Sequence, residues 1–165
     1  MLYWGMDNIK YLNAICEYRG KFIDACIMLE ITMDTFISDY FSEGNKKRSE
    51  LMALVLAPRV SWREKLAVFT VIIEVNHKDF YDKNSTLNTD ITDIIEHRNV
   101  FAHLPSNLTP NGQKLYNTKG IISFLKLKNA RQKKDIVLIR EPSYTAYEFN
   151  ELIKAIKHYH NSILT

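Results

Sequence analysis

Three polar side chains of chemically useful types lie close together in the stretch DIIEHRNVFAHLP, residues 93–105. Arg98 carries a planar guanidinium, which can hold a phosphate through paired hydrogen bonds. His103 can take up or release a proton near neutral pH, and Asn99 adds an amide beside them. Such a set could stabilise a phosphoryl transition state and move its protons without a metal ion. RNA supplies its own nucleophile, the 2′-hydroxyl, so these groups could suffice to cleave it.

A single helix must position the three residues. Arg98 continues the apolar stripe of that helix, so its side chain is expected on the buried face. Asn99 and His103 are four residues apart and should be neighbours on an adjoining face. The other members of the stripe are Ile91, Ile94, Ile95 and Ala102.

Each of the three residues also has a purely structural interpretation. Arg98 could form a buried ion pair, for which Glu30 is a candidate partner, or it could cap the carbonyls of a neighbouring helix. Asn99 could bond local backbone, and His103 could cap the helix end, where a cation suits the helix dipole. Taken singly, each residue fits the structural role, whereas the three at this spacing favour a site.

Helical periodicity predicts four helices in the first two thirds of the chain. They are expected at residues 7–43, 46–57 and 62–76, and from 88 or 89 to 103 or 104. The second should end at Pro58, and SWRE, residues 61–64, is a capping box that should begin the third. HKDFYDKNST is expected to be a loop or a fraying turn, and PSNLTPNGQKLYNTKG a polar loop.

Two segments rich in β-branched residues follow, IISFLKL and DIVLIR, and predict a β-hairpin over about residues 119–141. TAYE, residues 145–148, is a second capping box and should open a last helix over about 145–163. We therefore predict a single domain over residues 1–165 that is mainly α. It would be a bundle with core helices in 7–104, a small β-hairpin insertion and a C-terminal helix.

The segment RNVFAH resembles the Arg-x4-His motif of the HEPN superfamily, in which Asn follows the Arg. Its place at the end of a fourth helix, after a long first helix, is also similar, and implies a HEPN-like four-helix bundle. Many HEPN members are metal-independent endoribonucleases, often toxins of toxin–antitoxin, abortive-infection or CRISPR systems, and pair two motifs at a dimer interface. By this resemblance Arg98 and His103 would be catalytic and Asn99 would support them. The chain would be a homodimer that cleaves RNA, with an antitoxin protein as a candidate partner.

A second resemblance keeps a non-catalytic function open. SWREKLAVFTVII followed by DIIEHRNVFAH is similar to the mannitol operon repressor family, where a comparable Arg-Asn and Ala-His pair closes a helix without established nuclease chemistry. This implies a helical binding or regulatory module in which Arg98, Asn99 and His103 lock the bundle or the dimer. The catalytic and non-catalytic hypotheses differ in the side-chain exposure that they require, because a catalytic site needs Arg98 and His103 open to a cleft.

The order of charges favours a polyanionic partner. No Asp or Glu occurs from His97 through Lys134. Tyr116 and Phe124 could stack a base, as in single-strand binding proteins. Alternatively, the lysines only protect the edge of a solvated hairpin. The basic residues of the segment include Lys114 and Lys119, and the expected RNA contacts are Lys126, Lys128, Arg131, Lys133 and Lys134.

Several classes of protein are not expected. No Cys/His cluster has zinc spacing and no glycine-rich phosphate loop occurs, so we expect no metal and no cofactor. Cys16 and Cys26 stand too far apart on one helix to form a disulfide, which fits a reducing cytoplasm. The start shows no signal-peptide pattern, and no apolar run reaches membrane-spanning length. These features predict a cytoplasmic protein without a membrane partner.

Overall fold

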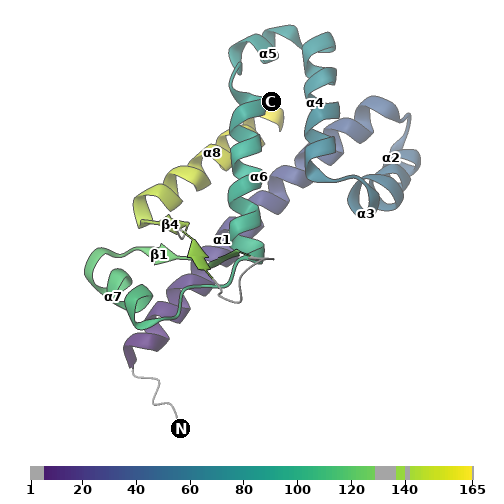
Figure 1. Ribbon diagram of the computed structural model, residues 1–165. Helices are drawn as coiled ribbons and strands as arrows, with labels where there is room; N and C mark the ends of the chain where they lie inside the picture. Colours follow the sequence, from purple (N-terminus) through teal and green to yellow (C-terminus); the bar gives the residue numbers. More distant parts are fainter. Residues whose placement is uncertain (1–5, 129–136, 140–141, 165) are drawn as a thin grey trace. The chain divides into compact units, whose positions relative to one another are not determined.

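The computed structural model describes residues 6–128, 137–139 and 142–164, with side chains described at 9–125 and 142–164. The described residues are mainly helical (Figure 1) and form two compact units. Unit 1 comprises Met1–Ile23 and Arg98–Ile153, and unit 2 comprises Asp24–His97 and Lys154–Thr165. Three helices contribute residues to both units: α1 (Met6–Phe41), α6 (Leu87–His103) and α8 (Ala146–Leu164). The single domain remains a prediction.

An aromatic core holds unit 1 together. The rings of Phe22 and Phe101 stack with their centroids 4.7 Å apart. Phe101 also contacts Phe124 at 5.1 Å and Tyr144 at 4.8 Å. Phe101 is only 1% exposed, so it is the residue through which the last turn of α6 enters this core.

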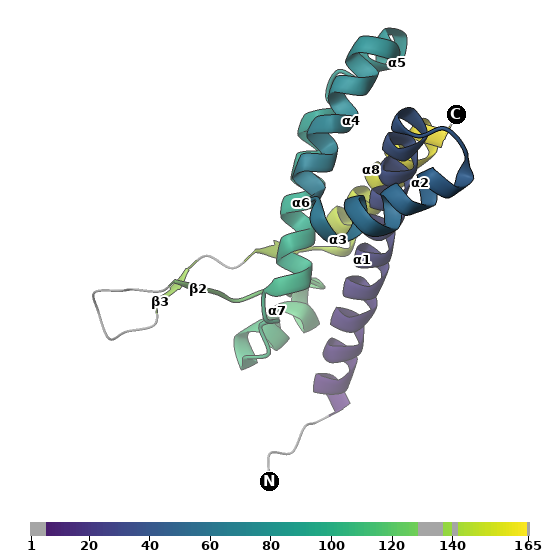
Figure 2. The ribbon, with the colours of Figure 1, turned by 90° about the vertical axis from the view of Figure 1, so that its right-hand side faces the viewer.

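Two short antiparallel strand pairs follow α6 in unit 1. Strand β1 (Ile122–Ser123) pairs with β4 (Ser143–Tyr144), and β2 (Lys126–Lys128) pairs with β3 (Val137–Ile139). Figure 2 shows β2 and β3 side by side. The predicted hairpin pairing is thereby confirmed, while its connector, residues 129–136, lies outside the described residues.

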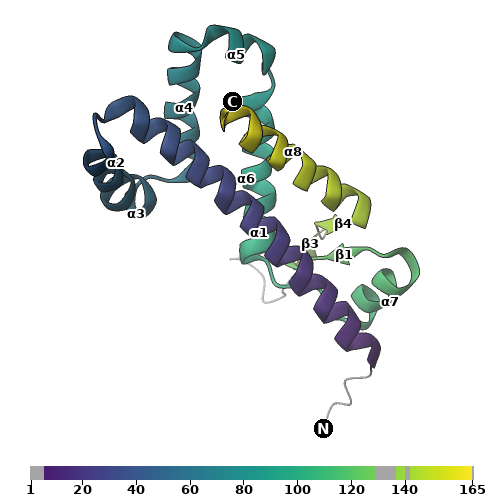
Figure 3. The same ribbon diagram turned by 180° about the vertical axis from the view of Figure 1, so that it is seen from behind.

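The expected loop PSNLTPNGQKLYNTKG contains a helix, α7 (Pro110–Lys119). The Thr109 side chain caps its start, and Gly120 ends it in the left-handed conformation with φ of 64°. Helix α7 lies beside the N-terminal part of α1 (Figure 3), where the aromatic rings of the two helices meet. The polar composition of this segment favoured a loop in the sequence analysis, although Thr109 and Gly120 are typical of the start and end of a helix.

Unit 2 contains the second part of α1, five further helical segments and parts of α6 and α8. Helix α4 and the first part of α6 run antiparallel and are joined by α5 (Figure 1). Among the described residues, no helix combines the length and apolarity needed to cross a bilayer. The five segments are α2 (Asn45–Leu51), the π-helical turn η1 (Met52–Leu56), α3 (Ala57–Arg59), α4 (Trp62–Asn76) and α5 (Lys78–Lys83).

Both predicted capping boxes form. Ser61 and Glu64 exchange hydrogen bonds at the start of α4, and Thr145 and Glu148 do so at the start of α8. In each box the hydrogen bond to the carboxylate lowers the pKa of the glutamate. Local signals of this kind fix where a helix begins.

Two predictions for unit 2 are wrong. HKDFYDKNST contains α5, and Pro58 lies inside α3 and does not end the preceding helix. The ring of a helical proline clashes with the carbonyl four residues earlier. Here the amide of Ala57 bonds the carbonyl of Met52, five residues back, and this wider π-helical turn makes room for the ring.

A buried cation lies in the core of unit 2. The Lys65 side chain is 1% exposed, and its Nζ lies 2.7 Å from Glu30 Oε1 and 2.8 Å from Asp34 Oδ2. Burial raises the pKa of Asp34, and the hydrogen bond from Lys65 opposes that rise only in part. The free-energy cost of removing the Asp34 carboxylate from water is therefore larger than the favourable free energy of its interaction with Lys65.

Loss of the cation and loss of a carboxylate should consequently differ in cost. Lys65→Met leaves two carboxylates without their cation and should lower the free energy of unfolding by roughly 3–5 kcal/mol at neutral pH. Asp34→Asn leaves Lys65 paired with Glu30 and should cost much less. Urea denaturation followed by circular dichroism measures both, and equal losses would contradict this account.

The contribution of Asp34 to the free energy of unfolding should depend on pH in a defined direction. Because its pKa is raised in the folded state, Asp34 contributes stability in full below its ordinary value of 3.8. That contribution is lost as the pH rises through the folded-state pKa. The Asp34→Asn variant should lack this part of the pH dependence.

Candidate functional site

The last turn and a half of α6 carries the motif on its outer side within unit 1. Asn99 and His103 are exposed and Arg98 is half-buried, whereas Phe101 points into the aromatic core. The expectation of a buried Arg98 is therefore wrong, and Ala102 of the same predicted stripe is exposed. The buried face of this turn is set by Phe101, its largest apolar side chain.

The three motif side chains contact one another loosely. Arg98 Nη1 lies 3.4 Å from Asn99 Oδ1 and 3.5 Å from His103 Nε2. Both distances are at the long limit of a hydrogen bond. With Arg98 as the donor, Nε2 of a neutral His103 is the acceptor and Nδ1 carries the proton. A guanidinium, an amide and an imidazole thus form one patch, which we call the motif patch.

Glu30, the partner considered for an ion pair with Arg98, belongs to unit 2 and is engaged there by another cation. Glu30 Oε1 accepts a hydrogen bond from Lys65 Nζ. Among the described residues of unit 1, Arg98 forms no ion pair with a carboxylate. Its guanidinium therefore keeps donors available for an external anion.

A different arginine closes the end of α6. Arg19 Nη2 donates a hydrogen bond to the carbonyl oxygen of Leu104, immediately after the helix. The Arg19 guanidinium also lies over the ring of Phe124, 5.2 Å from its centroid. The last carbonyls of a helix lack partners within it, and Arg19 supplies one. The motif is therefore not needed to cap this end.

Backbone hydrogen bonds hold the segment that follows α6. The amide of Leu125 donates to the carbonyl of Pro105 at 2.8 Å, and the amide of Asn107 donates to the carbonyl of Ser123 at 2.9 Å. Gly112 packs so closely here that a Cβ would lie 2.2 Å from the carbonyl oxygen of Asn107. These contacts place the motif patch on a well-fixed backbone.

Sequence reasoning missed Arg19 because no local pattern identifies it. It lies 85 residues before Leu104 and is one of many charged residues on α1. Gly112 and Asn107 were missed for the same reason, since their close packing arises only when the chain folds back. A distant cap is visible only in three dimensions.

The predicted RNA-binding residues fall mostly outside the described side chains. Lys126 and Lys128 belong to β2, but their side chains are not among those described. Arg131, Lys133 and Lys134 lie outside the described residues. Two other cations of the acid-free segment, Lys114 and Lys119, are exposed on α7.

The two aromatic residues proposed to stack bases differ in their placement. Phe124 is 0% exposed and packs against Phe101, so its predicted role in stacking is wrong. Phe124 is part of the aromatic core, because a buried β-rich segment next to α6 needs large apolar side chains. Tyr116 is half-buried, with its ring 5.0 Å from that of Tyr11.

His97 is distinct from the motif patch. It is half-buried in unit 2, and burial lowers its pKa, against the opposing charges of Asp93 and Glu96. Among the described residues, no group of three His, Cys, Asp or Glu side chains could hold a metal ion. The guanidinium and the imidazole of the motif patch are suited to anion binding and proton transfer.

No protein-family model, curated protein or solved structure matches this chain. The resemblance to the HEPN superfamily accordingly rests on the motif and its place at a helix end, and that to the mannitol operon repressor family rests on SWREKLAVFTVII followed by DIIEHRNVFAH.

Stability measurements should separate the cap from the motif. Arg19→Met keeps an apolar stem but removes the hydrogen bond to Leu104, and should lower the free energy of unfolding by about 2 kcal/mol. Asn99→Ala and His103→Ala should each change it by about 0.5 kcal/mol or less, because both side chains are exposed. Urea denaturation tests this. A larger loss of unfolding free energy for His103→Ala than for Arg19→Met would indicate that the motif residues stabilise the helix end.

Proposed function

We propose that this chain is a metal-independent endoribonuclease of the HEPN type, built on a HEPN-like four-helix bundle and active as a homodimer. The observation that carries the proposal is the availability of the motif patch. Arg98, Asn99 and His103 stand together on the outer side of α6, while Arg19 caps the helix end. A guanidinium with no carboxylate partner among the described residues of its unit is suited to binding a phosphate.

The motif residues have separate roles in the proposed reaction. Arg98 holds the scissile phosphate, Asn99 orients the guanidinium, and His103 acts as general base or general acid. The 2′-oxygen attacks the adjacent phosphorus as its proton passes to the base. The bond from phosphorus to the 5′-oxygen breaks, and that oxygen takes a proton from the acid. The products are a 2′,3′-cyclic phosphate and a 5′-hydroxyl end.

The homodimer supplies what one motif patch lacks. Base and acid act on opposite sides of the phosphorus, and a single His103 cannot occupy both positions at once. Two copies arranged about a two-fold axis present two histidines and two arginines to one phosphate. A role as a toxin or defence RNase, an antitoxin partner and a cytoplasmic location belong to this same proposal.

RNA cleavage by variants of the two charged motif residues is the direct test. In excess chelator, the wild-type protein should cleave a single-stranded RNA and leave 2′,3′-cyclic phosphate ends. His103→Ala removes proton transfer and should slow cleavage by roughly 10²–10⁴-fold. Arg98→Ala should abolish measurable cleavage. Gel analysis of an end-labelled RNA, with a 2′-deoxy version as the uncleavable substrate, provides the measurement.

Matched variants control for the loss of a surface charge or ring. His158→Ala and Arg59→Ala remove exposed residues of the same types and should leave cleavage unchanged. Full activity in His103→Ala would refute the catalytic assignment. A folded wild-type protein that binds RNA without cutting it would instead support the alternative, a non-catalytic binding or regulatory module.

The basic hairpin should determine how salt affects RNA binding. Changing Lys128, Arg131, Lys133 and Lys134 to Gln should flatten the dependence of log affinity on log salt by about 0.7 for each phosphate that the protein no longer neutralises. The fold of this variant should persist, and far-UV circular dichroism verifies it. Fluorescence anisotropy at several salt concentrations tests this with a catalytically inactive protein.

A control with the same change in net charge is available in unit 2. The exposed residues Lys46, Lys47, Lys78 and Lys83 can be changed to Gln together. An equal flattening in both quadruple variants would indicate a general charge effect, and an unchanged slope in the hairpin variant would assign its lysines to protection of a strand edge.

A further inference from the structure

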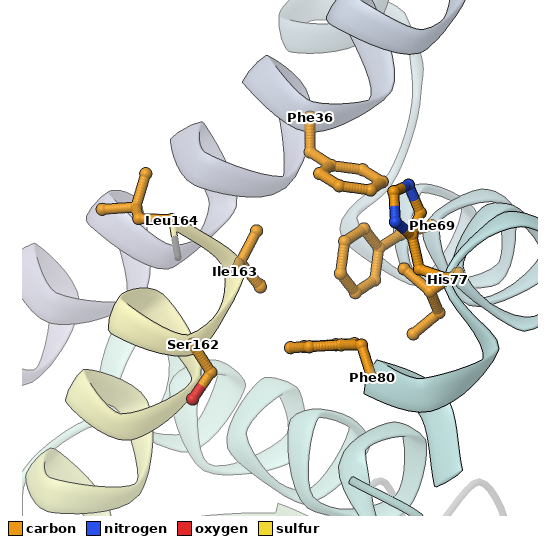
Figure 4. Close-up of a pocket in the computed structure, with 8 residues that line it drawn as sticks. Phe36, Phe69, His77, Phe80, Ser162, Ile163 and Leu164 are labelled. Atoms are coloured by element: carbon orange, nitrogen blue, oxygen red, sulfur yellow. The ribbon is translucent and has the colours of Figure 1, made fainter. Parts of the chain in front are cut away.

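A cavity of about 360 Å³ lies within unit 2, and no residue of the motif patch lines it. Three phenylalanine rings form much of its wall: Phe36 from α1, Phe69 from α4 and Phe80 from α5 (Figure 4). The cavity is partly open to solvent, so a small molecule could reach its walls. The remaining wall residues are Ile73, His77, Ser162, Ile163 and Leu164.

The arrangement of the walls suits an aromatic guest. Figure 4 shows Phe36 and Phe80 on opposite sides of the cavity, with Ile163 at one end and Phe69 and His77 at the other. The rings of Phe36 and Phe69 contact each other edge to face at 5.0 Å. A ring entering between Phe36 and Phe80 could contact both, by offset stacking or edge to face.

The size and charge of the walls narrow the class of guest. An apolar cavity of about 150 Å³ takes up benzene, so this one has room for about two rings. None of its wall residues is Asp, Glu, Lys or Arg. A charged guest would therefore lose its hydration without gaining a counter-ion. The guest should be neutral.

One polar group is placed to give the guest a fixed orientation. His77 is exposed, and its ring lies 5.6 Å from that of Phe36, so the imidazole stands between cavity and solvent. It can accept or donate one hydrogen bond. The hydroxyl of Ser162 already donates to the carbonyl of His158 at 2.8 Å.

Helix α5 is the element that completes the cavity. The amide of Phe80 bonds the carbonyl of His77 at 3.0 Å, so the first turn of α5 fixes the positions of both side chains. We propose that the cavity binds a neutral, flat aromatic molecule of about two fused rings, with one N–H or O–H group hydrogen-bonded to His77. This inference is independent of the proposed ribonuclease function.

Indole, which has two fused rings and one N–H, is a direct probe. Titrated into the full chain, it should bind with a Kd near or below about 1 mM and raise the melting temperature. Ile163→Phe places a ring in the cavity and should weaken binding at least tenfold. Ile31→Phe makes the same change at an exposed site of unit 2 and should leave binding unchanged.

A second pair of variants decides the matter if Ile163→Phe does not fold. Phe80→Ala removes one face of the cavity and should also weaken indole binding at least tenfold, whereas Phe41→Ala, at a 62% exposed residue, should not. Isothermal titration calorimetry gives the affinities, and far-UV circular dichroism verifies each fold. Absence of binding at several millimolar indole, or equal binding by the wild type and the folded cavity variants, would overturn the proposal.

Discussion

The carbonyl groups at the end of α6 impose the constraint on which unit 1 depends. A helix leaves its last carbonyls without internal partners, and this helix ends where the chain turns back into the core. Arg19 reaches Leu104 from α1, and the amide of Leu125 reaches Pro105 from the strand segment. The ring of Phe124 supports the Arg19 guanidinium and packs against Phe101 at the same time. The cap and the aromatic core are therefore one structure.

Burial of the Arg19 guanidinium opposes the stabilisation that this cap supplies. Desolvation lowers the pKa of Arg19, and its Nε is buried without a hydrogen-bond partner among the described residues. An arginine still keeps its charge at neutral pH, because its pKa lies far above that range. A lysine in the same place would have one charged nitrogen and no planar face to lie on the ring of Phe124. The Arg19 guanidinium both bonds the carbonyl of Leu104 and lies over the ring of Phe124. The motif patch is therefore not needed to cap the helix.

The helices that begin with capping boxes could be predicted from sequence because their signals are local. The partners Ser61 and Glu64, like Thr145 and Glu148, are three residues apart, and both boxes form. The start of α7 had a comparable signal in Thr109 followed by proline, but the polar composition around it favoured a loop. Helix length and helix order were therefore more predictable than the segments between helices.

The candidate site was predictable in its residues but not in its surroundings. Spacing on one helix is enough to bring Arg98, Asn99 and His103 together. Whether that group is buried depends on which neighbour enters the core, and Phe101 does so although the apolar stripe pointed to Arg98. The role of Arg19 depends on contacts between residues far apart in the chain, and no periodicity encodes them. Sequence patterns therefore gave the candidate chemistry, while tertiary packing determined its exposure.

Two cations of this protein show how partners decide what a charged side chain can do. Lys65 is buried between two carboxylates, and removing it would leave those charges without a partner, so its function is structural. Arg98 is half-exposed and meets only an amide and an imidazole at 3.4 and 3.5 Å among the described side chains. Contacts this long return little free energy, so a phosphate can replace them at little cost. The chain directly after the motif is held by Arg19 and the strand segment, so on the proposed function an anion would reorient side chains without disturbing the helix end. A catalytic site for phosphate esters requires preorganised donors, so on the proposed function the bound phosphate and the partner copy's motif patch would have to fix these side chains.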